Sequence, residues 1–458
     1  MEKNAWKKYN SRQRKEVFSF AEGYRKFISD CKTERECVNK GIEIAEANGF
    51  RDIRECIAKG EKLKAGDKVY LNNMGKDLAL FIIGQKPLEE GMNILGAHID
   101  SPRIDFKQHP FYEDSDIALA DTHYYGGIKS YQWVTLPLAL HGVVCRKDGS
   151  VQEIVIGEKL SDPVVGISDL LIHLAGKQMQ KKASEVIEGE DLNVTIGSIP
   201  LEKEEKDAVK ANILKLLKKN YGIEEDDFIS AEIEVVPAGP ARNYGLDESM
   251  IMGYGHDDRV CAYTSLMAMM QIENPEKTVS CMLVDKEEVG SIGATGMQSY
   301  FYENVVAEIL ELCGGYNDLK MRRCLANSSM LSSDVSAAYD PNYPGVNELK
   351  NTAFFGRGIV MNKYVGSRGK GGSNDANPEF IARIRKVWDE NEISWQTAEI
   401  GRVNEGGGGT IAYIMAKYNM QVIDSGVAVQ NMHAPWEVIS KVDAYEAMKA
   451  YVAFCKFM

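Results

Sequence analysis

The sequence has 458 residues, which exceeds the usual size of one hydrophobic core and predicts two domains. Hydrophobic residues make up 44% and charged residues 26% of the chain, as in soluble globular proteins. The net charge of −13 argues against a nucleic-acid partner. No apolar run approaches the roughly 20 residues of a membrane span, so we expect no membrane partner. The N-terminus lacks the apolar core of a signal peptide, and the nine cysteines form no C-x-x-C pair, which predicts a cytoplasmic protein.

The first hundred residues show an α/β pattern. Residues 12–48 carry apolar side chains at helical spacing and predict two helices. Residues 65–85 predict a β-hairpin, and residues 93–97 predict a buried strand. This strand places His98 at its carboxyl end, where open α/β sheets bind their ligands.

The pattern changes between residues 104 and 244, where long β-like stretches dominate. This block holds no cluster of histidines and carboxylates, so we interpret residues 105–245 as an inserted β-rich domain that packs on another subunit or covers a site on the flanking residues. The elements expected within it are strands over 134–145, 151–157 and 228–236, an amphipathic helix over 168–180 that carries His173, and a lysine-rich helix over 204–220.

The α/β pattern returns in residues 246–458, which together with residues 1–104 would form one α/β domain. A helix over 260–272 follows Asp257, and a buried strand over 279–284 leads to Glu287 and Glu288. The other elements expected here are helices over 300–312, from Pro378 and over 437–457, and strands over 395–400 and 420–424. Residues 325–330 lead into the segment that carries Asp334.

Five segments end in a potential metal ligand at a strand edge or a strand-to-helix turn. They are His98, Asp257, Glu288, Asp334 and His433. Two histidines and three carboxylates without a thiolate fit zinc, manganese or cobalt better than a structural zinc site. If one carboxylate bridges, these five side chains can hold two divalent ions and leave positions open for water and substrate.

Two further carboxylates accompany this set. Adjacent residues of an extended chain point to opposite sides, so Glu287 would stay free beside Glu288 as the general base on a metal-bound water. Asp100, two residues after His98, would share its face and orient the imidazole. Each residue also has a plain structural interpretation, such as a buried histidine, a helix cap at Asp257 or a solvated Glu-Glu turn.

Five motifs, GAHIDSPR, GHDDR, DKEEVGS, SSDVS and MHAPWE, occur in this order. Together they resemble the aspartyl aminopeptidase family of dinuclear zinc exopeptidases over nearly the whole chain. The resemblance implies a catalytic three-layer α/β/α domain with a mixed sheet, interrupted by a β-rich dimerisation domain. It also implies peptide substrates, two divalent ions with zinc favoured over manganese or cobalt, and a homo-oligomer of dimers that assemble into a tetrahedral dodecamer.

The resemblance also assigns roles to individual residues. It implies that one metal binds His98, Asp257 and Asp334, and that the other binds Glu288, His433 and the bridging Asp257. Glu287 matches the general base, and Asp100 matches the residue that orients the first histidine. His173 lies in a segment similar to one whose histidine reaches the active site of a neighbouring subunit.

Two loops depart from the family pattern. Residues 405–410 form a glycine tract where eukaryotic members carry a cysteine-containing turn, and residues 362–370 form a longer, glycine-rich loop. An acidic substrate side chain would need Lys363, Arg368 or Lys370 in the specificity pocket, and the alternative is that all three are solvated loop charges. We therefore expect an aminopeptidase for acidic or for neutral and hydrophobic N-terminal residues. The alternatives are a related metallo-carboxypeptidase or amidohydrolase, and a non-catalytic assembly protein with a structural metal site.

Overall fold

The structure is a computed structural model that describes residues 4–458. They form two compact units, of which the first runs to Asp100 and resumes over Ala241–Met432 and Glu437–Met458. The second unit consists of Ser101–Pro240 and His433–Trp436. The second unit therefore interrupts the first directly after Asp100.

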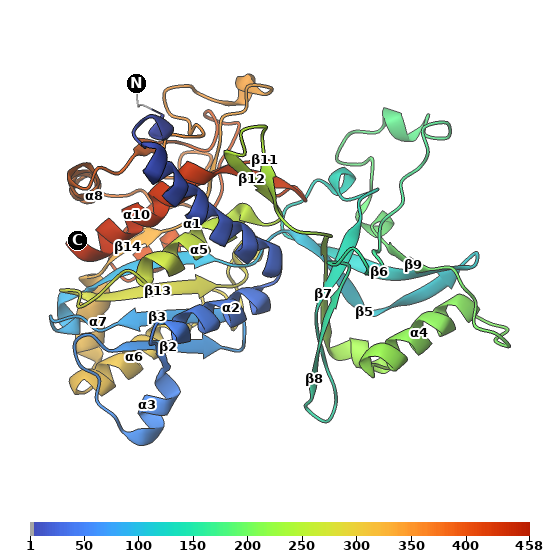
Figure 1. The fold of residues 1–458 in the computed structure, drawn as a ribbon, viewed down its shortest axis with the longest axis horizontal. Helices are drawn as coiled ribbons and strands as arrows, with labels where there is room; N and C mark the ends of the chain where they lie inside the picture. Colours follow the sequence, from blue (N-terminus) through green and yellow to red (C-terminus); the bar gives the residue numbers. More distant parts are fainter. Residues whose placement is uncertain (1–3) are drawn as a thin grey trace. The chain divides into compact units, whose positions relative to one another are not determined.

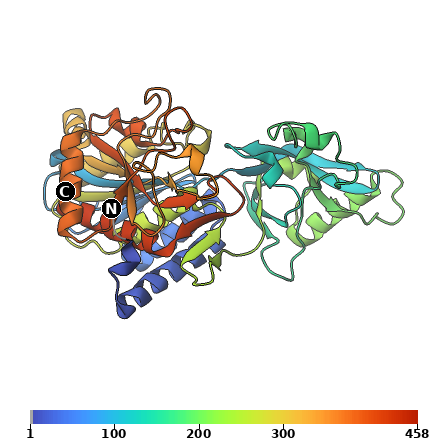
Figure 2. The ribbon, with the colours of Figure 1, turned by 90° about the horizontal axis from the view of Figure 1, so that it is seen from above.

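A nine-stranded mixed sheet organises the first unit (Figures 1 and 2). Its central strands β13, β4, β14 and β18 run parallel, while β3 and β16 on either side of them are antiparallel to their inner neighbours. β13 lies between β3 and β4, although it follows both in sequence. In spatial order the strands are β1 (Arg51–Asp52), β2 (Lys68–Asn73), β3 (Asp77–Ile82), β13 (Thr278–Val284), β4 (Met92–His98), β14 (Ser329–Ser332), β18 (Gln421–Gly426), β16 (Ile359–Asn362) and β17 (Trp395–Thr397).

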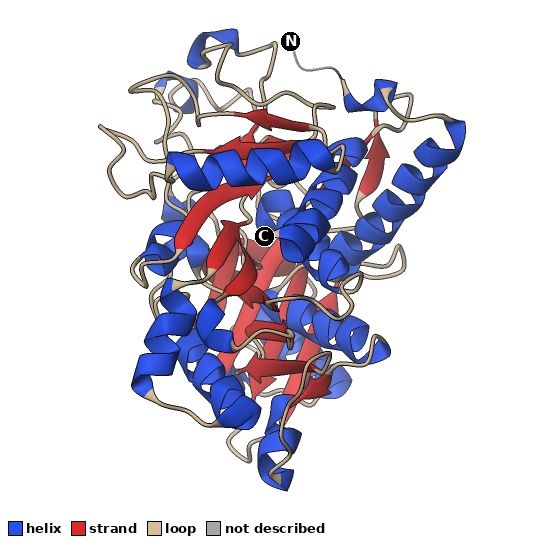
Figure 3. Cartoon of the chain, turned by 90° about the vertical axis from the view of Figure 1, so that its left-hand side faces the viewer, coloured by secondary structure: helices blue, strands red, loops and turns tan. Residues whose placement is uncertain are grey.

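Helices cover both faces of this sheet, as Figure 3 shows for the strands in red and the helices in blue. Every residue of β3, β4 and β13 is buried, because strands covered on two sides are apolar almost throughout rather than alternating. Helices α1, α2, α5, α8 and α10 share one apolar cluster with the sheet, and α3, α6, α7 and α9 share the other. The helices of this unit are α1 (Ser11–Asp30), α2 (Glu34–Ala47), α3 (Ile53–Lys59), α5 (His256–Met269), α6 (Phe301–Gly314), α7 (Asp318–Ala326), α8 (Pro378–Glu390), α9 (Ala412–Ala416) and α10 (Lys441–Phe457).

A smaller five-stranded sheet in the same unit corrects one prediction. The helix expected over 437–457 begins only at Lys441, because Glu437–Ser440 form a strand that pairs with β12 and β19. A long-range partner for four residues cannot be recognised from a local pattern. The strands of this sheet are β11 (Arg242–Tyr244), β12 (Met250–Gly253), β20 (Glu437–Ser440), β19 (Ala428–Gln430) and β15 (Ser336–Ala337).

The second unit contains a six-stranded antiparallel sheet with one α-helix, α4 (Ala208–Tyr221), against strands β5, β6 and β9. In spatial order its strands are β8 (Val151–Ile156), β7 (Leu138–Cys145), β10 (Ala231–Pro237), β5 (Arg103–Asp114), β6 (Ile117–Tyr125) and β9 (Val194–Gly197). The mixed α/β class with a β-rich insertion, predicted from the sequence, is confirmed.

The helix predicted over 168–180 is wrong. These residues form turns that end in the 3₁₀ helix η4. Leu171 and Ile172 are 55% and 68% exposed, and an amphipathic segment that buries no apolar face gains little from becoming helical. The short 3₁₀ helices of the described chain are η1 (Ala5–Lys7), η2 (Leu88–Glu90), η3 (Ser130–Gln132), η4 (Gln178–Gln180), η5 (Gly189–Asp191), η6 (Glu225–Ser230), η7 (Glu287–Val289) and η8 (Pro344–Val346).

Within residues 4–458, none of the helices combines the length and the apolar character that crossing a bilayer requires.

Candidate active site

The carboxyl ends of the central parallel strands bring the predicted site residues of the first unit together. His98 is the last residue of β4, and Asp334 lies two residues beyond β14, its parallel neighbour. Glu287 begins η7 just after β13, whose last residue Val284 is paired with His98. Asp257 lies at the start of α5. Four elements that are distant in sequence therefore deliver polar side chains to one edge of the sheet.

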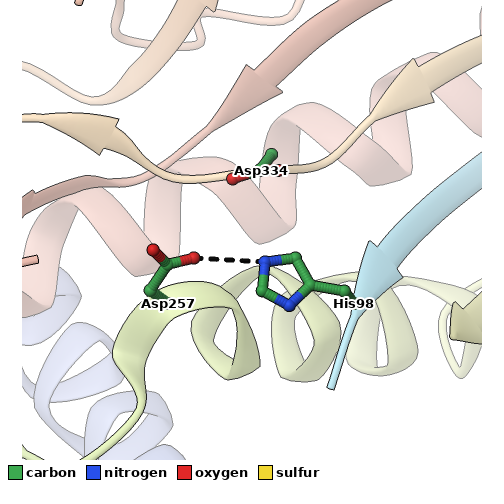
Figure 4. Close-up of side chains that lie close together, drawn as sticks. All are labelled: His98, Asp257 and Asp334. Atoms are coloured by element: carbon green, nitrogen blue, oxygen red, sulfur yellow. Dashed lines mark ion pairs between the residues drawn. The ribbon is translucent and has the colours of Figure 1, made fainter. Parts of the chain in front are cut away.

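His98, Asp257 and Asp334 converge on a common point (Figure 4). The Nε2 atom of His98 lies 3.2 Å from Oδ1 of Asp257. One potential ligand atom from each of the three residues lies within 4.8 Å of the others. His98 and Asp257 are buried, and Asp334 is partly exposed. This arrangement can hold one divalent cation and leave a side open to a substrate.

Glu287 and Glu288 reach the same place, which corrects one argument from the sequence. They lie in the 3₁₀ helix η7 rather than on an extended chain, so they do not point to opposite sides of a strand. One carboxylate oxygen of each lies within 4.8 Å of a ring nitrogen of His98. Oxygens of Glu288 and Asp257 are also within 4.8 Å of each other. The carboxylates of Glu287 and Glu288 therefore lie together beside His98, in one corner of the site.

Asp100 holds this corner in place. The backbone N–H groups of Glu287 and Glu288 donate to Oδ1 and Oδ2 of Asp100, each over 3.1 Å. The Nδ1 atom of His98 lies 3.2 Å from Oδ1 of Asp100 and 3.0 Å from its carbonyl oxygen. Because Asp100 is fully buried, one carboxylate fixes both the orientation of the imidazole and the backbone of the Glu-Glu pair.

Two acidic residues that the sequence did not single out also support the site. The backbone N–H of Asp257 donates to Oε2 of Glu437 over 2.9 Å, and the backbone N–H of His98 approaches Oδ2 of Asp258 at 3.4 Å. Glu437 belongs to the MHAPWE motif and Asp258 to GHDDR, so the motifs were a signal from which both residues could have been found. The role of Glu437 depends on the pairing of β20 with β12, which no local signal indicates.

Burial and the close approach of several charged groups shift the pKa values of the site residues. Burial and the nearby carboxylate of Asp258 raise the pKa of Asp334 well above its usual range. Burial lowers the pKa of His98, but hydrogen bonds to Asp100 and Asp257 outweigh it and raise the value well above the usual range. Buried histidine and carboxylate donors without a thiolate are the ligands of a zinc, manganese or cobalt ion, so the residues present fit the predicted metal.

Two predicted histidines belong to the second unit and two predicted lysines to the first. His433 and His173 belong to the second unit, where Nδ1 of His433 is 2.9 Å from the carbonyl oxygen of Gly127 and His173 is exposed in a turn. Lys363 and Lys370 both form ion pairs with Asp375, a residue that the sequence did not indicate.

Comparison with known proteins decides the family. The model of the aminopeptidase I zinc metalloproteases, M18, matches residues 27–455. The chain belongs to the M18 peptidase family. A probable M18 family aminopeptidase 1 of Clostridium acetobutylicum is 62% identical over 453 residues, which cover 99% of this chain and 97% of that protein. An M18 aminopeptidase structure from Thermotoga maritima superimposes with a TM-score of 0.96 at 44% identity and covers all of both chains.

A more distant neighbour shares the fold alone. The S. cerevisiae mApe1 dodecamer is 20% identical, with a TM-score of 0.77, 95% of this chain and 96% of that one covered. The resemblance inferred from the motifs is confirmed at the level of the M18 family, and the chain is a metallo-aminopeptidase of that family.

Proposed function

We propose that this M18 enzyme removes single N-terminal residues from peptides with the aid of two divalent cations, zinc being the favoured one. The observation that carries the proposal is the cluster of His98, Asp257, Glu287 and Glu288 at the carboxyl edge of the central strands. The description of the family as zinc metalloproteases supports the choice of metal. Manganese and cobalt suit the same donors.

The proposed ligands divide into two sets that share one carboxylate. His98, Asp257 and Asp334 would hold the first ion, and Asp257, Glu288 and His433 the second. The mutual distances of the residues of the first unit support this division, because Asp257 lies within 4.8 Å of both His98 and Glu288. The inclusion of His433 is supported by its motif, MHAPWE, and by the resemblance to dinuclear exopeptidases.

Two such ions, when bound, would supply Lewis-acid polarisation of the scissile carbonyl and a lowered pKa for a bound water. The residues of the chain supply the proton transfers. Glu287 would accept a proton from the attacking water and return it to the leaving amine. Its carboxylate is 3.9 Å from Nε2 of His98, and its side chain is 15% exposed, so it lies beside the proposed ligands and is partly accessible to solvent. Asp100 would act as a positioning residue through the backbone of Glu287 and the ring of His98.

We also propose that the chain forms a homo-oligomer in which the second unit mediates dimerisation, and that dimers assemble into a tetrahedral dodecamer. The dodecamer named for the yeast relative supports the assembly, and exposed apolar side chains around His173 support an interface. Leu171, Ile172 and Leu174 are 55%, 68% and 68% exposed. Burial of such a patch would bring His173 against a second copy, where it would reach the neighbouring active site.

Release of amino acids from matched peptides tests the proposed function. The protein would be stripped by a chelator and reloaded separately with zinc, manganese or cobalt, then given peptides with free or acetylated N-termini. We expect metal-dependent release from free N-termini alone. Equal release from acetylated peptides would indicate a carboxypeptidase or endopeptidase. No release with any metal, from folded and assembled protein, would refute the proposal.

A further inference from the structure

A pocket of about 220 Å³ lies between two loops of the first unit, which span residues 364–370 and 399–406. The first loop follows β16 and the second follows β17. The loops interlock, because the backbone N–H of Gly408 donates to the carbonyl of Val365 over 2.9 Å. A Cβ atom at Gly407 would come within 2.7 Å of the backbone nitrogen of Ser367, so this approach requires glycine.

Both loops are anchored next to a proposed metal ligand. Asn362, at the base of the first loop, donates to Oγ of Ser336 over 3.3 Å, two residues beyond Asp334. Thr410, at the end of the second loop, donates to Asp424 over 2.7 Å, and Asp424 is paired in register with Ser332, two residues before Asp334. The loops that line the pocket are therefore attached beside β14 and the residues that follow Asp334. This attachment makes the pocket a candidate site for the side chain of a substrate's first residue.

Lys370 lines this pocket, Lys363 directly precedes its first lining residue, and both lysines are already paired. Lys363 and Lys370 form ion pairs with the two different oxygens of Asp375, the second over 3.1 Å. The ammonium group of Lys370 also lies 4.0 Å from the ring centre of Tyr364. Hydrogen bonds from Lys363 and Lys370 lower the pKa of Asp375, so its carboxylate is ionised at neutral pH.

The backbone on either side of Asp375 is fixed independently of its side chain. Asn374 donates to the carbonyl of Val422 over 2.6 Å, and the N–H of Ala376 donates to the carbonyl of Lys363 over 2.9 Å. The carboxylate is thus held between the two ammonium groups by the chain itself. Its removal leaves the anchors of the loop in place.

Other charges of the lining are also matched. Arg402 pairs with Glu405 over 2.9 Å, and the hydroxyl of Tyr364 donates to Glu399 over 2.6 Å. Arg368 is the remaining cation, and it is exposed at the end of its loop. A carboxylate that enters this pocket meets the exposed Arg368, and at Lys363 and Lys370 it meets ammonium groups that already share Asp375 and its negative charge.

We propose that Asp375 is a specificity-determining residue, which neutralises Lys363 and Lys370 so that the pocket accepts an uncharged N-terminal side chain in preference to Asp or Glu. This inference rests on the proposed aminopeptidase function and names its substrate class. A substrate carboxylate would have to displace Asp375 from its ion pairs or remain beside it and be repelled. Either case costs binding free energy, and an uncharged side chain such as leucine avoids this cost.

The test compares the metal-loaded full-length enzyme with D375N on peptides that differ only in their first residue. We expect D375N to raise kcat/KM for N-terminal Asp and Glu relative to Leu about fivefold, the scale of one partly exposed charge pair. The gain should appear mainly in KM and shrink in high salt, because added ions screen exposed charges. Addition of K363Q and K370Q to D375N should remove it.

Removal of the two lysines instead of Asp375 should change the charge preference of the pocket in the opposite direction. In the K363Q/K370Q protein, Asp375 loses both partners and should favour N-terminal Lys over Leu by about fivefold relative to the wild type. The matched control is D318N, which removes the exposed carboxylate paired with Arg322 on α7 and should leave every ratio unchanged.

The outcomes separate the inference from the function on which it rests. Unchanged ratios in both D375N and K363Q/K370Q, from proteins that still release leucine, would overturn the role of Asp375 and leave the aminopeptidase intact. Absence of release by the wild type from every free N-terminus would refute the proposed function and this inference with it.

Discussion

Replacement of Asp100 by Asn isolates the contribution of one positioning carboxylate. Its two oxygens accept the backbone N–H groups of Glu287 and Glu288 over 3.1 Å each, and Asn offers an N–H₂ group in place of one of them. The backbone N–H of Glu287 or Glu288 then faces the N–H₂ group of the new side chain and loses its acceptor in a fully buried position. Loss of a hydrogen bond to a charged acceptor costs about 1.5–3 kcal/mol, which corresponds to roughly 10- to 150-fold. We expect D100N to lower kcat/KM by an amount in this range.

Metal retention provides the second measurement for D100N. Loss of a carboxylate that orients a metal-bound histidine weakens metal binding by about 10- to 100-fold. The zinc content after dialysis against graded chelator should therefore fall earlier in D100N than in the wild type. Turnover and metal retention both within twofold of wild type would refute the positioning role of Asp100.

Asp443 offers a matched control for the loss of a buried acceptor. It is fully buried and accepts the N–H groups of Gly356 and Gly358 over 2.7 Å each, in a part of the first unit that we assign no catalytic role. D443N should change the free energy of unfolding and leave kcat/KM and metal retention unchanged. An equal loss of activity in D443N would show that the D100N effect reflects stability alone.

Four further predictions follow from the same contacts. E287Q should retain its metals by elemental analysis and lose kcat by about 100-fold or more, since a general base contributes on that scale; near-normal turnover would exclude Glu287 as the base. G426A should lower stability in urea by about 1–3 kcal/mol, because its Cβ would lie 2.0 Å from the carbonyl oxygen of Asp334, and should weaken zinc binding in a competition titration. Burial raises the pKa of Asp443 to about 8, above the unfolded value of about 3.9, so the folded protein binds the extra proton and the stability of wild type relative to D443N should decline from pH 5 to pH 9 in urea titrations. Chelation should lower the melting temperature and added zinc should restore it, because a ligand that binds the folded state stabilises it.

The sequence predicted the central strands well, for a physical reason. Strands that are buried on both faces are continuous apolar runs, and residues 93–97 and 279–284 are of this kind. The helix over 168–180 was predicted from apolar spacing alone, and its large apolar side chains are exposed in the structure. A local pattern cannot report whether a face for burial exists.

In the candidate site, too, the sequence predicted what local pattern determines and missed what depends on distant strand pairing. The positions of His98 and Glu288 at strand ends follow from local pattern and from the rule that ligands bind at those ends. The contacts of Asp100 with the backbone of Glu287 and of Glu437 with Asp257 depend on the register of β13 with β4 and of β20 with β12. The pairing of Asp375 with two lysines depends on how a glycine-rich loop turns, and such turns carry little local signal.

The position of β13 between β3 and β4 has a consequence for how the chain can fold during translation. β3 and β4 leave the ribosome together but cannot pair, since the strand that joins them starts at Thr278, beyond the whole insertion. Until that strand is synthesised, the edges of β3 and β4 that would face it keep unpaired backbone N–H and C=O groups. Unpaired strand edges favour aggregation and chaperone binding. The antiparallel sheet of the insertion has all of its strands by Pro237 and can form earlier. Nascent chains arrested before Thr278 should therefore protect the insertion from protease while the N-terminal hundred residues remain sensitive.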